Sequence, residues 1–253
     1  MIEFQEYFGE PHRRIRQKVK KFVEREINPF VNEWEEKGGF PTELYRTAGQ
    51  SGILGIGYPE VYGGSDGDIF IKIAALEELM RCGSAGVVAG LCSLDISIPP
   101  ILSVGSEEQK ARFVTPVLHG NKIAALGVTE PSGGSDVANL STKAILRGDH
   151  YAVSGSKMFI TSGFRAHQVT CAVRTGEEGH KGISFLSLIL IHLVIQCLKS
   201  SKKWGGGLRT RPRFSLMNAR CLLKTFWERK DKVFISLWKI SRMKDCSFPL
   251  WQI

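Results

Sequence analysis

Residues 126–136 read LGVTEPSGGSD, and residues 151–163 read YAVSGSKMFITSG. The first stretch predicts a buried strand that runs into a turn of proline, glycine and hydroxyl residues. Glycines in such a turn let backbone N–H groups approach a planar or anionic ligand, and Thr129 and Ser135 add hydroxyl donors. The second stretch predicts a strand that ends in an aromatic, aliphatic and hydroxyl triplet before a glycine. Taken singly, the first stretch is as typical of a surface loop as of a ligand site, and the second is more typical of a core strand with a turn.

The chain before residue 122 has the pattern of helices. Apolar residues recur at three- and four-residue spacing in residues 13–31 and again in residues 69–82. Residues 85–102 are apolar and rich in small side chains, which predicts burial between helices. Ser106, followed by two glutamates and Gln109, is typical of a helix N-cap.

From Lys122 onward the period changes to that of strands. Residues 123–128 and 169–173 predict buried strands, and residues 140–154 predict a hairpin around a turn at residues 147–150. Helices first and an antiparallel β segment afterwards indicate an α+β protein.

The charge is unevenly distributed along the 253 residues, whose net charge is +9. Residues 1–186 hold 20 Lys+Arg and 22 Asp+Glu, whereas residues 187–253 hold 14 and 3. The positive charge therefore belongs to the tail, and the near-neutral part gives no reason to expect a phosphate-bearing macromolecule as partner. Six cysteines are too sparse for a disulfide scaffold.

No transit or signal peptide is visible, and the apolar run at residues 183–198 is shorter than the roughly 20 residues that span a bilayer. We therefore expect a cytoplasmic protein with no membrane partner.

Together, the two quoted stretches resemble the acyl-CoA dehydrogenase family. Its signature T-E-P-x-x-G-S-D precedes G-x-K-x-[FW]-I-T-[NS]-G, and both are present here at the family's spacing. Further matches lie at residues 26–29, 40–41, 52–55, 59–64 and 105–110, so the resemblance covers almost all of residues 1–186.

The resemblance implies a helical N-terminal domain at residues 1–121 and a middle β domain, here partial and barrel-like, at residues 122–186. A C-terminal four-helix domain would follow, with FAD between the last two. It also implies oxidation of an acyl-CoA thioester to the 2,3-enoyl thioester, with an electron-transfer flavoprotein as acceptor. The family is homotetrameric, but the tetramer interface lies in the C-terminal domain, so we do not expect a tetramer of this chain.

The resemblance also assigns site residues. Those that would line the flavin are Leu126, Gly127, Val128, Thr129, Gly134 and Ser135. Thr129 would bond the ring edge, and Ser135 would also contact the acyl-CoA. Those that would border the isoalloxazine are Phe159, Ile160 and Thr161.

No residue here is assigned as the catalytic base, because the family's glutamate lies in the C-terminal domain. Lys157 is interpreted as a structural or solvated residue rather than as a catalyst. The cysteines Cys82, Cys92 and Cys171 lack metal-ligand spacing, so no metal site is expected. The five histidines before residue 187 fall in predicted loops and ends and receive no role; they are His12, His119, His150, His167 and His180.

Residues 187–253 lack the family pattern, and we interpret them as a frame-displaced tail. Back-translation of residues 203–208, read from the third base, permits M-G-W-W-A, as the family requires. A one-base slip near residues 186–188 would explain this agreement. We accordingly expect a truncated chain with weak FAD binding and no dehydrogenase turnover.

Two other functions remain open. A flavin oxidase or monooxygenase of the same fold would retain the same motifs. A tail that binds nucleic acid or membrane would use the 14 basic residues, but these form no helical stripe and no RNA-binding motif.

Overall fold

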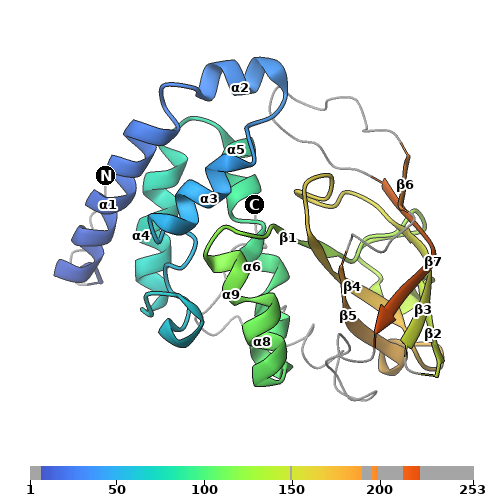
Figure 1. The fold of residues 1–253 in the computed structure, drawn as a ribbon. Coiled ribbons are helices and arrows are strands. Elements are labelled where there is room, and N and C mark those ends of the chain that lie inside the picture. The colour runs from blue at the N-terminus through green and yellow to red at the C-terminus, as the bar shows by residue number, and fades with distance from the viewer. Residues whose placement is uncertain (1–6, 149, 190–194, 199–212, 223–253) are drawn as a thin grey trace.

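The computed structural model describes residues 7–148, 150–189, 195–198 and 213–222. A helical unit comes first and a sheet unit follows, with β1 lying at the border between them (Figure 1). The helices are α1 (Glu10–Glu26), α2 (Val31–Lys37), α3 (Glu43–Gln50), α4 (Ile69–Met80), α5 (Ala85–Leu91), α6 (Leu94–Ser97), α7 (Pro99–Val104), α8 (Glu107–Phe113) and α9 (Thr115–Leu118). The strands are β1 (Ala124–Gly127), β2 (Lys143–Arg147), β3 (His150–Lys157), β4 (Gln168–Arg174), β5 (Ile183–Ile189), β6 (Ile195–Leu198) and β7 (Arg213–Leu222). The 3₁₀ turns are η1 (Glu60–Tyr62), η2 (Val137–Asn139) and η3 (His180–Gly182).

Helix boundaries follow capping chemistry. The side chain of Asp68 accepts the N–H of Ile71 at the start of α4. At α8, Ser106 and Gln109 form the reciprocal capping box, which confirms the predicted N-cap. These bonds satisfy amide groups that have no partner within their own helix.

One helix prediction needs correction. The single helix expected over residues 13–31 is divided, because α1 ends at Glu26 and α2 begins at Val31. Pro29 lies in this gap, and proline has no N–H to continue a helical ladder. The apolar residues 85–102 are largely buried, as expected, and they fall in three short helices with Pro99 at the start of the last one.

The strands form one open sheet with the order β1-β4-β2-β3-β7-β6, and β5 pairs with β4. The predicted hairpin is confirmed, since β2 and β3 pair antiparallel from Lys143 with Ser154 to Arg147 with His150. β4 pairs antiparallel with β5 along its whole length.

The expected antiparallel, barrel-like sheet is wrong in two details. β1 and β4 are parallel, with Ala124 opposite Gln168, and β2 meets β4 in parallel at one pair, so the sheet is mixed. The sheet is also open. Parallel neighbours require a long crossover, which the hairpin and its loops provide here.

The helical unit is joined to the sheet by one continuous core and by buried hydrogen bonds. The larger core cluster includes helix residues together with Ala124, Ala172 and Phe185 from the strands. Ser93 Oγ donates to the carbonyl of Ala124 at 3.0 Å, and Thr170 Oγ1 donates to the carbonyl of Ser97 at 2.7 Å. The position of β1 is therefore set from the helical side.

The predicted boundary between residues 186 and 187 falls inside β5. β6 and β7 come from the basic tail, and β7 pairs antiparallel with β3. The remainder of that prediction, including residues 203–208, lies outside the described residues.

Candidate functional site

The two signature stretches meet directly. The N–H of Met158 donates to the carbonyl of Thr129 at 2.8 Å, which joins the end of β3 to the end of β1. Thr129 and Met158, which lie 29 positions apart in sequence, are thus adjacent in the fold. We call the edge formed by the two stretches at this contact the rim. The predicted grouping of these stretches at one site agrees with this contact.

The first stretch turns tightly after β1. Glu130 and Gly133 exchange backbone hydrogen bonds of 2.9 and 3.1 Å. Residues 131–136 are all exposed. Within the described part of the chain, the N–H groups of Gly134 and Ser135 donate to no protein group. Among the described residues, the turn therefore presents backbone N–H groups without a backbone partner together with hydroxyls, a combination that suits phosphate.

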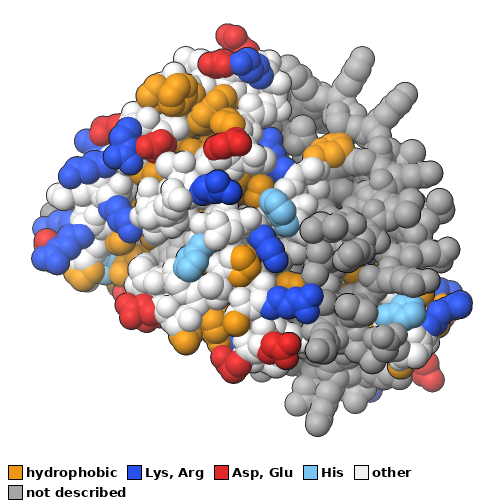
Figure 2. Space-filling view, in the orientation of Figure 1, with side chains coloured by type: hydrophobic (Ala, Val, Ile, Leu, Met, Phe, Trp, Pro, Cys, Tyr) orange, Lys and Arg blue, Asp and Glu red, His pale blue; other side chains and the backbone are white. Residues whose placement is uncertain are grey.

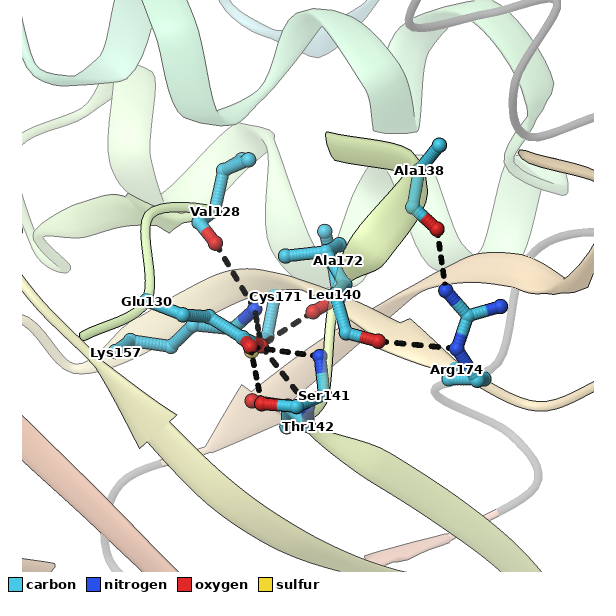
Figure 3. Close-up of polar contacts among 10 residues, drawn as sticks. All are labelled: Val128, Glu130, Ala138, Leu140, Ser141, Thr142, Lys157, Cys171, Ala172 and Arg174. Atoms are coloured by element: carbon cyan, nitrogen blue, oxygen red, sulfur yellow. Dashed lines mark hydrogen bonds and ion pairs between the residues drawn. The ribbon is translucent and has the colours of Figure 1, made fainter. Parts of the chain in front are cut away.

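Glu130, at the start of this turn, is buried, with only 3% of its surface exposed. Its oxygens accept the Ser141 N–H at 2.7 Å, the Ser141 hydroxyl at 2.5 Å and the Thr142 N–H at 2.9 Å. Lys157, on β3, donates its ammonium to Glu130 at 2.8 Å and to the carbonyl of Val128 at 3.0 Å (Figure 3). The two signature stretches are therefore also joined by a buried ion pair.

The pKa of Glu130 reflects this environment. Burial raises the pKa of the carboxyl, but the hydrogen bonds from Lys157, Ser141 and Thr142 outweigh burial and lower it to about 2. The carboxylate is consequently charged at neutral pH and keeps Lys157 paired. Both groups act in structure, which agrees with the interpretation of Lys157 as structural.

Arg174 fixes the far end of the same loop. Its guanidinium donates to the carbonyls of Leu140 at 3.0 Å and Ala138 at 2.6 Å (Figure 3). It also donates to the carbonyls of Glu177 and Gly179 at 2.6 and 3.0 Å. Residues 131–139 are thus held at both ends while their middle remains exposed.

The second stretch has an unusual backbone. Phe159 and Ser162 have φ angles of 58° and 59°, which non-glycine residues seldom adopt. Phe159 keeps 48% of its surface exposed on the rim beside the turn. An exposed aromatic ring with a constrained backbone suits contact with a planar ligand.

The expected site residues fall into three groups. Gly134, Ser135 and Phe159 are exposed, and Leu126, Val128, Thr129 and Thr161 are partly buried. Gly127 and Ile160 are buried, and the side chain of Ile160 belongs to the second core cluster. Ile160 therefore offers only its backbone to a ligand on the rim.

Several residues that build the site were not predicted from the sequence. These are Glu130, Arg174, Ser162 and Tyr45, whose roles depend on partners far away in the chain. Glu130 and Lys157 lie inside the two motifs, and charged residues in otherwise apolar strand ends were the signal available.

Among the described residues, no group of three or more His, Cys, Asp or Glu side chains could hold a metal ion. His12 lies at the third position of α1, at a helix end as expected, and it is buried. Its Nε2 lies 3.2 Å from Asp68, and its Nδ1 accepts the Gly9 N–H.

In the described ranges, no single helix is long and apolar enough to cross a membrane. The segments Ala85–Leu91 and Leu94–Val104, bent by 44°, pass that test only as a pair. On the face shown in Figure 2, charged side chains of both signs intermingle over the helical unit.

A helical domain that leads into a mixed sheet, with the two signature stretches adjoining where β1 and β3 end, defines the class of this protein. Two family models match it: "Acyl-CoA dehydrogenase, N-terminal domain" at residues 9–121 and "Acyl-CoA dehydrogenase, middle domain" at residues 125–205. The chain belongs to the acyl-CoA dehydrogenase family.

Individual relatives agree. The short-chain specific acyl-CoA dehydrogenase of Clostridium acetobutylicum is 42% identical over 173 residues, which cover 67% of this chain and 45% of that protein. The crystal structure of a probable acyl-CoA dehydrogenase from Mycobacterium abscessus has a TM-score of 0.88 at 38% identity and covers 92% of this chain and 62% of that one. An acyl-CoA dehydrogenase from Bacillus anthracis complexed with FAD has a TM-score of 0.83 at 25% identity and covers 92% and 40%. The chain spans about half the length of the curated relatives it matches.

Proposed function

We propose that the protein is by family an FAD-dependent acyl-CoA dehydrogenase, whose reaction oxidises an acyl-CoA thioester to the 2,3-enoyl thioester, and that this chain by itself binds the flavin without turning over the substrate. The observation that carries the proposal is the junction of the two signature stretches through Met158 and Thr129. This junction groups the residues expected to contact the flavin along one rim. The relative from Bacillus anthracis with bound FAD supports the choice of cofactor.

The residues present suit FAD. The half-exposed ring of Phe159 offers a face to the isoalloxazine, and the partly buried hydroxyl of Thr129 offers a hydrogen bond to the ring edge. A Cβ added to Gly133 would meet no atom within 4 Å, so the turn leaves room for a ligand close to its backbone. Ser135 and the free amides of the turn suit a phosphate or the acyl-CoA.

Bound FAD would supply the hydride acceptor of the reaction. This chain's own residues would bind and orient the ring, Thr129 by a hydrogen bond and Phe159 by its aromatic side chain. The proton is removed from the substrate by a glutamate that we do not place on any described residue. We propose acyl-CoA as the substrate, an electron-transfer flavoprotein as the acceptor and the cytoplasm as the location.

FAD binding by the purified chain tests the cofactor assignment. We expect a weak but saturable complex, followed by flavin fluorescence, which Thr129→Val and Phe159→Ala weaken further. Ile145→Ala is a suitable control, because Ile145 is exposed on β2 outside the rim. Equal FAD affinity in the two rim variants and the wild type would contradict the proposed site.

Turnover is tested separately by adding acyl-CoA to the flavin-loaded chain. We expect no loss of the yellow colour, since no described residue is assigned as the base. A chain that bleaches with acyl-CoA would overturn this expectation and would confirm the dehydrogenase activity directly. Reoxidation by oxygen alone, with hydrogen peroxide formed, would favour the oxidase alternative.

A further inference from the structure

The segment 159–162 begins and ends with a residue whose backbone is left-handed. Phe159 and Ser162 both have φ near 60°, and neither is a glycine or an asparagine. Such conformations persist only where surrounding contacts impose them. The contacts that impose the conformation of Ser162 come from the helical unit.

Ser162 is tied to two helices. Its hydroxyl lies 3.0 Å from the hydroxyl of Tyr45 on α3, and both hydroxyls lie within hydrogen-bond distance of the carbonyl of Gly90 on α5, at 3.2 and 3.0 Å. Ser162 and Tyr45 are only 7% and 2% exposed. Each hydroxyl carries one hydrogen, so one donates to the carbonyl while the other donates to its neighbour.

Close packing makes this triangle possible. A Cβ on Gly90 would lie 2.6 Å from the ring of Phe40, so only glycine lets the three elements approach this closely. Arg165 adds a second tie, because its guanidinium donates to the carbonyl of Phe40 at 2.9 Å and lies 4.4 Å from that ring. The segment between Phe159 and Arg165 is therefore attached to the helical unit at two points.

Two backbone bonds report on the conformation. The N–H of Gly163 donates to Ile160 at 3.1 Å, and the N–H of Arg165 donates to Ser162 at 3.0 Å. The first bond closes a turn that spans the left-handed Ser162, and the second closes a turn that begins at this residue. They can form only while the segment keeps this shape.

We propose that Tyr45, Ser162 and Arg165 are positioning residues for the flavin, through which the helical domain holds Phe159 and Thr161 in their ligand-ready conformation before the cofactor binds. This inference rests on the proposed function for the identity of the ligand. None of the three residues belongs to the set expected to contact the cofactor. They act through the backbone of the segment that does.

Amide hydrogen exchange of the full chain without cofactor is the first test. In Ser162→Gly and Tyr45→Phe, the Gly163 and Arg165 amides should exchange about tenfold faster than in the wild type, because a buried hydrogen bond of the triangle is lost. The amides of β4 should remain unchanged. Ser162→Gly also relieves backbone strain, so its thermal midpoint should not fall in proportion.

Ser162→Asn is the matched variant. Asparagine tolerates the left-handed region and carries an amide donor that can reach the carbonyl of Gly90, so it should restore wild-type protection. Unprotected Gly163 and Arg165 amides in the wild type, or the same exchange in all four proteins, would overturn the proposal.

FAD titration gives the second readout. The dissociation constant should rise about tenfold in Ser162→Gly and Tyr45→Phe and return with Ser162→Asn. A wild-type chain that binds no FAD would refute the proposed function, while the exchange data would still decide whether the helical domain shapes the segment. Faster exchange with an unchanged dissociation constant would refute the positioning role alone.

Discussion

The ammonium of Lys157 lies 2.8 Å from the carboxylate of Glu130, and both side chains are almost completely buried. Glu130 belongs to the first signature stretch and Lys157 to the second. The pair therefore links the two halves of the candidate flavin site from beneath. Its removal should affect both stability and cofactor binding.

Breaking this ion pair should be strongly destabilising. Glu130→Gln leaves the Lys157 ammonium buried without its counter-charge, and such losses cost about 3–5 kcal/mol. Chemical denaturation measures the free energy of unfolding. The exposed pair of Lys20 and Glu24 gives a control, since Glu24→Gln should change stability by only about 0.5 kcal/mol. Similar losses in both variants would contradict the importance of the buried pair.

Acid should weaken the fold through Glu130. The folded pKa of about 2 lies below the ordinary 4.5, so the stabilisation is complete above pH 4.5 and is lost as the pH falls towards 2. The loss is on the order of 3 kcal/mol. Unfolding free energies between these pH values should therefore converge for the wild type and Glu130→Gln. A constant difference would show that the carboxyl is not held in its charged form.

The glycines of the turn should differ in their effect on FAD. A Cβ on Gly134 would lie 3.2 Å from the methyl group of Thr129, whereas one on Gly133 meets nothing within 4 Å. Gly134→Ala should displace Thr129 and weaken FAD binding about tenfold. Gly133→Ala should bind FAD with an affinity closer to that of the wild type. Flavin titration of the two variants checks this, and the opposite order would contradict the placement of Thr129 at the ring.

Arg174 should be needed for the loop that follows the turn. Arg174→Met removes donors from four backbone carbonyls, so we expect a loss of about 2 kcal/mol or more. Protease cleavage within residues 131–142 should become faster. Arg147, which is exposed on β2, provides the control variant Arg147→Met. Unchanged cleavage in Arg174→Met would show that the loop is fixed by Glu130 alone.

The frame-displacement interpretation of residues 187–253 stays a prediction. The family match continues to residue 205, past the charge step at residue 186. Sequencing of the gene around codons 184–188 should reveal a one-base displacement. Confirmation of the frame, with a relative that carries the same tail in frame, would reject the interpretation.

The sequence alone predicted the order of the units and most of their elements. Ser106 and Gln109 form the expected cap, and residues 140–154 form the expected hairpin. Such features depend on neighbours a few positions away, so they can be predicted from a single sequence. The division between α1 and α2 was missed because the periodicity of apolar residues continues across Pro29.

The pairing of strands could not be predicted in the same way. Apolar runs predict that residues 123–128 and 169–173 are buried strands, but they do not specify which strand lies beside which or in which direction. The parallel pairing of β1 with β4 depends on contacts with the helical unit, such as Ser93 with Ala124 and Thr170 with Ser97.

The sequence by itself determined the family and the two stretches that form the candidate site, because motifs of glycine, hydroxyl and aromatic residues at fixed spacing are local. Only the tertiary structure decided how these stretches are held in place. Glu130 pairs with Lys157, and Ser162 forms a hydrogen bond with Tyr45, which lies 117 positions earlier in the chain. The physical reason is that burial gives a polar side chain its partner, and burial depends on how distant segments pack.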